Sequence, residues 1–188
     1  VIDTLLFFPC CYRDTTVLWA EVTISTSTPY SNMIFSINGE VQFDADQSFT
    51  NCTFYFGPMA KITMNANVEA VFKGCALVAG CDYMWDGIYV DAPSEKLIME
   101  NCKVLDAINA VCSYSNGYYS LKQNYFRQNY ISLFVKNSEP GFTGVMSDNE
   151  LCQNSALAYP PYVGSKGFAG VKTYHAASVN IGPGNEFD

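Results

Sequence analysis

Three carboxylates are the strongest candidates for a chemical site in this sequence. Asp82 and Asp86 lie on either side of Trp85, and Asp106 follows about one sequence repeat later. Glycoside hydrolases hold two or three carboxylates at a fixed separation, so these three are the candidate catalytic residues for polysaccharide cleavage. We favour the alternative, that they are solvated loop carboxylates. The chain has no Asp-Asp dyad, and Arg127 has no partner of an obvious catalytic type.

Aromatic side chains indicate a second kind of site, which would bind a ligand without turning it over. The chain has 13 Tyr, 13 Phe and 2 Trp residues. Aromatic rings on an exposed face can stack on sugar rings. Packing in or beside the core is the alternative for each ring, above all for Trp85. We expect the exposed patch in loop 113–119. The candidate ligand-binding residues are Trp85, Tyr83, Tyr114, Tyr118 and Tyr119.

The composition argues against several classes of partner. The net charge is −8 and the ten Lys and Arg residues form no cluster, so we expect no nucleic-acid partner. No apolar run approaches the roughly 18 residues that span a membrane, so we expect no membrane insertion. The chain has no CxxC pair and a single histidine, His175, so we expect no metal site, and we expect no cofactor.

A sequence repeat predicts the elements that would position these residues. A hexad with Asn or Gly followed by Cys at its centre occupies residues 49–54, 72–77 and 99–104, and looser copies follow. The period lies within the range of roughly 20 to 50 residues that is typical of solenoids. Asn and Gly tolerate left-handed backbone, so we expect the anchors of the repeat to be structural corners and not ligands. The anchors are Asn51, Gly74, Asn101, Asn124 and Asn149.

Each repeat is expected to contain three short strands. Residues 96–102 alternate apolar and polar side chains, 103–107 form a second candidate strand, and a third begins at 108. We therefore expect an all-β fold, a right-handed parallel β-helix of about six coils. The LxxLxLxxN spacing of leucine-rich repeats is absent. We expect an irregular N-terminal cap at 1–34 and the β-helix at 35–188, together forming part of a larger protein.

Cysteines recur with the repeat. Cys52, Cys75 and Cys102 hold the same place in successive hexads, so we expect a column of small buried thiols. Cys75 and Cys81 are close in the sequence and lie on either side of a predicted turn, which allows a local disulfide between them.

Three motifs together resemble a known class of domain. They are Phe-x-Asn-Cys-x-Phe at 49–54, Gly-Pro-x-Ala-Lys-Ile at 57–62 and Cys-x-x-Met-Trp-x-Gly-Ile at 81–88. Over about residues 35–155 the chain resembles right-handed β-helix domains in large secreted or surface proteins of Bacteroidetes-type bacteria. The resemblance implies an extracellular or cell-surface location and export by type IX secretion. This class has no single chemistry, so the resemblance implies fold and location more than activity.

The sequence as a whole predicts a non-catalytic structural or adhesive module of a secreted or cell-surface protein, with polysaccharide as the candidate ligand. The first alternative is a fragment of a polysaccharide-active enzyme, either a lyase or a glycoside hydrolase. The second is a cargo or subunit of a secretion or surface complex. The expected partner is accordingly a polysaccharide or another surface or secretion protein.

Overall fold

The chain is built from short parallel strands. A computed structural model describes residues 16–140, 144–153, 155–176 and 179–188, and the regular secondary structure within these ranges is entirely β. One sheet has seven strands, in the order β2 (Thr28–Ser31), β4 (Gln47–Thr50), β7 (Glu69–Lys73), β10 (Lys96–Glu100), β13 (Tyr118–Lys122), β16 (Val145–Ser147) and β19 (Asn180–Ile181).

The other sheet has two arms that meet at β3 (Ile34–Phe43), with which β1 (Val17–Ile24) also pairs. The long-strand arm contains β6 (Lys61–Met64), β9 (Trp85–Val90), β12 (Ala107–Tyr114), β15 (Ile131–Lys136) and β18 (Ala169–Tyr174). The short-strand arm contains β5 (Thr53–Phe56), β8 (Ala76–Ala79), β11 (Lys103–Leu105), β14 (Tyr125–Arg127), β17 (Glu150–Cys152) and β20 (Glu186–Phe187).

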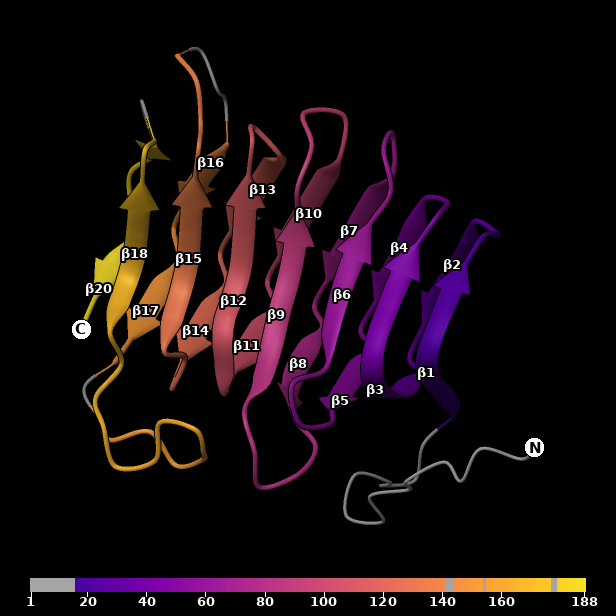
Figure 1. Cartoon of the computed structure of the whole chain (residues 1–188), viewed down its shortest axis with the longest axis horizontal. Helices are drawn as coiled ribbons and strands as arrows, with labels where there is room; N and C mark the ends of the chain where they lie inside the picture. The colour runs from indigo at the N-terminus through magenta and orange to yellow at the C-terminus, as the bar shows by residue number, and fades with distance from the viewer. Residues whose placement is uncertain (1–15, 141–143, 154, 177–178) are drawn as a thin grey trace.

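The pairings between these strands are parallel and follow the sequence repeat. Lys96 of β10 pairs with Glu69 of β7 in the preceding coil and with Tyr118 of β13 in the following one. The coils stack from β1 and β2 at one end to β18, β19 and β20 at the other (Figure 1). The fold is therefore a β-solenoid of about six turns, which confirms the all-β parallel stack predicted from the repeat.

The core is a continuous stack of alternate side chains. In β10, Leu97 and Met99 are fully buried between exposed or half-buried neighbours, because successive residues of a strand point to opposite faces. Some buried rings then stack on a ring of the next coil. Phe49 stacks on Phe72 with ring centroids 4.9 Å apart, and Phe35 stacks on Phe54 at 4.7 Å.

Regular stacking begins before residue 35. Residues 17–31, which the sequence assigned to an irregular cap, form β1 and β2, and these pair in parallel with β3 and β4. Residues 1–15 of the expected cap lie outside the described residues.

Left-handed residues turn the chain between the seven-stranded sheet and the short-strand arm. Asn51, Gly74 and Asn101 have φ values of 53°, 63° and 55°, so the three anchors from the hexads occupy corners as predicted. A left-handed backbone costs Asn and Gly less than other residues, which explains their recurrence at this position.

The last two anchors deviate from this prediction. The left-handed residues in these coils are Gln123 (φ 57°) and Asp148 (φ 55°), one position before Asn124 and Asn149. The reason is the length of the coil between β10 and β13. The register of these two strands makes that coil one residue shorter than the spacing between the anchors Asn101 and Asn124. Asn124 therefore aligns with Cys102, and its side chain is buried.

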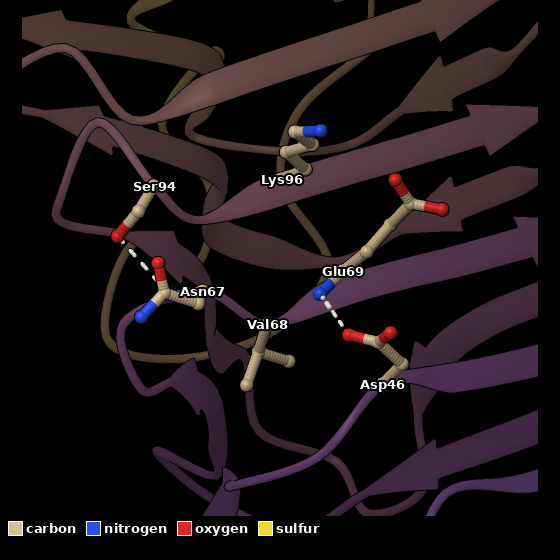
Figure 2. A pocket seen from close by; sticks show the side chains of 6 residues that line it. All are labelled: Asp46, Asn67, Val68, Glu69, Ser94 and Lys96. Carbon is tan, nitrogen blue, oxygen red and sulfur yellow. Dashed lines mark hydrogen bonds between the residues drawn. The ribbon is translucent and has the colours of Figure 1, made fainter.

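A second set of turns leads into β4, β7 and β10, and it encloses a shallow depression. A carboxylate oxygen of Asp46 accepts a hydrogen bond of 2.8 Å from the backbone N–H of Glu69, and the Ser94 hydroxyl accepts one of 3.1 Å from the N–H of Asn67 (Figure 2). These bonds tie successive turns together. The depression has a volume of about 390 Å³ and is lined by Asp46, Asn67, Val68, Glu69, Ser94 and Lys96.

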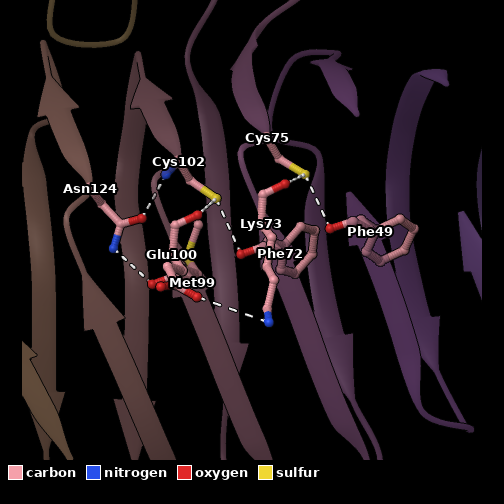
Figure 3. Close-up of polar contacts among 8 residues, drawn as sticks. All are labelled: Phe49, Phe72, Lys73, Cys75, Met99, Glu100, Cys102 and Asn124. Carbon is pink, nitrogen blue, oxygen red and sulfur yellow. Dashed lines mark hydrogen bonds and ion pairs between the residues drawn. The ribbon is translucent and has the colours of Figure 1, made fainter. Parts of the chain in front are cut away.

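A ladder of buried and half-buried polar side chains runs along the inside of the first set of corners (Figure 3). The Cys75 thiol donates to the backbone oxygens of Phe49 (3.5 Å) and Lys73 (3.4 Å). In the equivalent place two coils later, the amide of Asn124 donates to the backbone oxygen of Met99 at 3.0 Å. Thiol and amide thus donate to equivalent carbonyls in different coils. The ladder consists of Cys52, Cys75, Cys102, Asn124, Asn149 and Asn185.

The prediction of a disulfide between Cys75 and Cys81 is wrong. Cys75 is a free thiol in the ladder, only 1% exposed and held by two carbonyl groups, so it cannot turn toward the loop that follows β8. Cys81 lies in that loop and is disulfide-bonded.

Candidate functional site

The outer surface of the long-strand arm brings together a group of aromatic side chains outside the core. Alternation points the even-numbered residues near the ends of β12 and β15 outward, because the odd-numbered residues Val111, Leu133 and Val135 pack in the core. Parallel register then aligns them across the strands. Tyr114 pairs with Lys136, and Lys136 pairs with Tyr174. We call the group Tyr89, Tyr114, Phe134 and Tyr174 the aromatic face.

Ring contacts link Tyr89, Tyr114 and Phe134, and Tyr174 joins them through the Lys136 side chain, whose Nζ lies near the Tyr114 and Tyr174 rings. Tyr89 and Tyr114 meet edge to face at 5.9 Å, and Tyr114 meets Phe134 in the same way, also at 5.9 Å. Such contacts favour fixed ring orientations. At the β6 side, the Nζ of Lys61 lies 5.9 Å from the Tyr89 ring and forms an ion pair of 3.0 Å with Glu40.

Loops limit the aromatic face on one side. The segment between β17 and β18 and the loop between β8 and β9 project from the same edge of the stack (Figure 1), and the N–H of Met84 donates to the Pro160 oxygen at 2.9 Å. The ring of Tyr162 stacks on Tyr130 at 3.8 Å. These segments bury Met84 and Ile108, so the accessible part of the outer surface lies toward the strand ends.

Titratable groups beneath and beside the rings have perturbed pKa values. Burial raises the pKa of the Cys112 thiol to about 12, with a further contribution from the charge of Asp86. Burial also raises the pKa of Asp86, against the lowering effects of a hydrogen bond from Tyr89 and the charge of Lys61. Cys112 is therefore a neutral, unreactive thiol that supports the rings.

The structure places two predicted ligand-binding residues in the core, so those predictions are wrong. Trp85 is fully buried, stacks on Phe56 at 4.1 Å and donates its indole N–H to the backbone oxygen of Leu105 at 2.8 Å. Tyr119 is also fully buried, on the inner face of β13. Neither ring can stack on a ligand without unfolding the coil that holds it.

Three predicted residues remain outside the core, and one of them belongs to the aromatic face. Tyr114 is half-buried on β12 beside Tyr89 and Phe134. Tyr83 lies in the loop before β9, and Tyr118 lies at the start of β13 on the other sheet, so the three do not form one surface. Sequence reasoning missed the other members of the face, whose signal is outward alternation near the ends of the long strands.

The candidate carboxylates occupy three different environments. Asp82 is exposed in the loop after β8, Asp86 points outward from β9, and Asp106 occupies a left-handed corner (φ 60°) between β11 and β12. The charge that acts on Asp86 comes from Lys61, and the one that acts on Asp106 comes from Arg127. Neither Asp86 nor Asp106 is perturbed by another of these three carboxylates, unlike the paired carboxylates of a glycosidase. Within the described ranges, no group of three or more His, Cys, Asp or Glu residues could hold a metal ion.

Asp106 nevertheless makes a testable contribution to pH-dependent stability. Burial raises its pKa from 3.8 to about 6, so the folded protein binds more protons than the unfolded chain between these values. Stability should therefore fall as the pH rises through that window. We expect Asp106→Asn to raise the free energy of unfolding at pH 8 by roughly 1 kcal/mol, a figure reduced for partial exposure, with no gain near pH 3.5.

Urea unfolding at the two pH values measures this effect. Asp148→Asn is the matched control, because Asp148 is an exposed carboxylate at another left-handed corner (φ 55°) and Asn suits that backbone equally well. Equal gains at both pH values would show that Asn stabilises the corner through its backbone preference and that the charge of Asp106 has no part in it.

Comparisons with known proteins add no further assignment. The chain matches no protein-family model, no curated protein and no solved structure. In the described part of the chain, no helix is long and apolar enough to span a membrane.

Proposed function

We propose that the chain is a non-catalytic, glycan-binding β-helix module of a secreted or cell-surface protein. The observation that carries the proposal is the aromatic face, in which rings from four successive long strands lie on one outer surface. Stacked strands hold these rings in place before any ligand binds, so little ordering entropy is lost on binding. Sugar rings have apolar faces that stack on such a surface.

We also propose that each coil contains three strands and that the helix is right-handed. The order β4, β5, β6 is followed by β7, β8, β9, each strand pairing with its counterpart in the next coil, which supports three strands per coil. Parallel strands joined by a crossover are right-handed in about 98% of cases, which supports a right-handed helix.

An extracellular or cell-surface location is supported by one covalent feature. Cys81 is disulfide-bonded, and structural disulfides form and persist mainly in oxidising compartments. The five free cysteines in the described residues are all buried, which protects them from oxidation in such a compartment. Type IX export and membership of a surface complex remain proposals that rest on the resemblance of the motifs.

A glycan array with the purified chain tests the proposed function, with parallel assays for new reducing ends and for unsaturated products. The proposal requires binding to at least one polysaccharide and no turnover of it. Turnover would favour the alternative of a polysaccharide-active enzyme. If the chain neither binds nor cleaves any glycan, the result would favour a structural role or a place in a secretion complex.

Tyr114→Ala should weaken glycan binding about five- to tenfold, because it removes the ring that contacts both Tyr89 and Phe134. Isothermal titration with the best array ligand measures the change. Tyr118→Ala is the control, since it removes a half-buried ring from the other sheet and should leave affinity unchanged. An equal loss in the two variants would place the binding surface elsewhere.

A further inference from the structure

The C-terminal half of the aromatic face carries cations as well as rings. In register, Phe134 of β15 lies beside Lys172 of β18, and Lys136 of β15 lies beside Tyr174 of β18. Rings and ammonium groups therefore alternate across neighbouring strands, which lie about 4.8 Å apart. The residues of this patch, which we call the cation–aromatic patch, are Tyr114, Phe134, Lys136, Phe168, Lys172 and Tyr174.

Each lysine of the patch stands over two rings. The Nζ of Lys136 lies 5.6 Å from the centroid of Tyr114 and 5.8 Å from that of Tyr174. The Nζ of Lys172 lies 5.0 Å from both Phe134 and Phe168. Ring contacts of this kind position an ammonium group but use none of its three N–H donors as conventional hydrogen bonds to oxygen.

Within the described residues, no carboxylate forms an ion pair with Lys136 or Lys172. Among the described residues, the ion pairs are Lys61 with Glu40 and Lys73 with Glu100, so Lys136 and Lys172 have no salt bridge there. This contrasts with the other end of the long-strand arm, where Lys61 also faces a ring but is paired. The patch therefore presents two free positive charges in a chain whose net charge is −8.

The rings of the patch are exposed enough to be contacted. Phe168 is 58% exposed and Tyr174 is 50% exposed, and both are among the most exposed large apolar side chains in the described residues. An exposed aromatic group beside unpaired cations combines a stacking surface with anion-binding groups.

We infer that the cation–aromatic patch binds an acidic glycan, a chain of sugar rings that carries carboxylate or sulfate groups; this rests on the proposed function. The rings stack on sugar faces, and the two ammonium groups pair with anionic substituents. A neutral glycan would leave both ammonium groups unpaired. A nucleic acid requires the neutralisation of many closely spaced phosphates, which two lysines on an acidic chain do not provide.

The inference can be tested by isothermal titration of the full chain with matched ligands. The probes are oligogalacturonate, its fully methyl-esterified form, a sulfated glycan of similar length and a single-stranded oligonucleotide. We expect oligogalacturonate or the sulfated glycan to bind at least tenfold more tightly than the neutral ester, and the preferred one identifies the anionic group. We expect no binding of the oligonucleotide, and preferential binding of it would overturn the inference.

Variants separate this inference from the proposed function. The double variant K136Q/K172Q keeps two polar side chains and should reduce affinity for the acidic glycan about tenfold, with little effect on any binding of the ester. The control K103Q/K122Q removes two exposed lysines from the short-strand arm and the other sheet and should change neither. Equal binding of acid and ester, unaffected by K136Q/K172Q, would overturn the acidic-glycan inference and leave glycan binding intact. No binding to any glycan would overturn both.

Discussion

Gly87→Ala should destabilise the protein more than any other conservative substitution we can identify, by about 4 kcal/mol or more. Gly87 has a φ of 153°, which side-chain-bearing residues rarely adopt, and a Cβ at this position would overlap the carbonyl oxygen of Asn109 in the next coil. Backbone cannot move aside as a flexible side chain can. The two residues pair at a β-bulge, where the register of β12 shifts between Asn109 and Val111.

Urea unfolding followed by circular dichroism measures this effect. Gly182→Ala is the matched control, because the added Cβ would come no closer than 3.1 Å to another atom, the backbone oxygen of Met146. We expect its cost to remain within about 1 kcal/mol. A Gly87→Ala protein as stable as the Gly182→Ala protein would show that the pairing of β9 with the bulged β12 is not as described.

Asn149→Leu should have the second largest effect, a loss of roughly 3 to 5 kcal/mol. The Asn149 amide donates to the backbone oxygens of Leu121 (2.9 Å) and Ser147 (3.0 Å), and its oxygen accepts from the backbone N–H of Asn124 (2.9 Å). Leu has a similar volume but can replace none of these bonds. Each buried polar group left without a partner costs about 1 to 3 kcal/mol.

Asn149→Cys is the informative companion to this variant. Cys75 and Cys102 occupy the same ladder and direct their thiols to the equivalent carbonyls, with Sγ to oxygen distances of 3.4 to 3.5 Å. We therefore expect Asn149→Cys to lose less stability than Asn149→Leu, because the thiol is a weak donor but still a donor. Thermal and urea unfolding of the three proteins gives the order. If Leu were tolerated as well as Cys, hydrogen bonding in the ladder would contribute little to stability.

Local sequence patterns predict much of this fold. The strands expected at 96–102 and 103–107 and the one beginning at 108 correspond to β10 (Lys96–Glu100), β11 (Lys103–Leu105) and β12 (Ala107–Tyr114). The corner residues Asn51, Gly74 and Asn101 are also where the repeat places them. These features depend on alternation and on backbone preference, which act within a few residues.

Alignment between coils is harder to predict, because it depends on the exact length of each coil. A single residue fewer between β10 and β13 moves the left-handed position to Gln123 and turns Asn124 into a member of the buried ladder. The long segment between β17 and β18 places Lys172 far along the sequence from Phe134, its neighbour across the strands. No fixed period reveals that these two side chains are adjacent.

Position on a strand also distinguishes outward-facing rings from core rings. Trp85 and Tyr119 lie on inner faces of their strands, and Tyr114 lies on an outer one. Near a turn or a bulge the alternation is interrupted, so the sequence around residues 81–88 and 113–119 does not specify which face each ring occupies.

The most direct test of a glycan-binding aromatic face is a map of where the ligand binds. Amide and side-chain chemical shifts of the isotope-labelled chain can be followed by NMR during titration with the glycan that binds best. Binding at the aromatic face predicts that the largest changes occur at Tyr114, Phe134 and Tyr174, with small changes on the seven-stranded sheet. Changes concentrated at the depression beside Asp46 and Glu69, or changes at no defined surface, would contradict it.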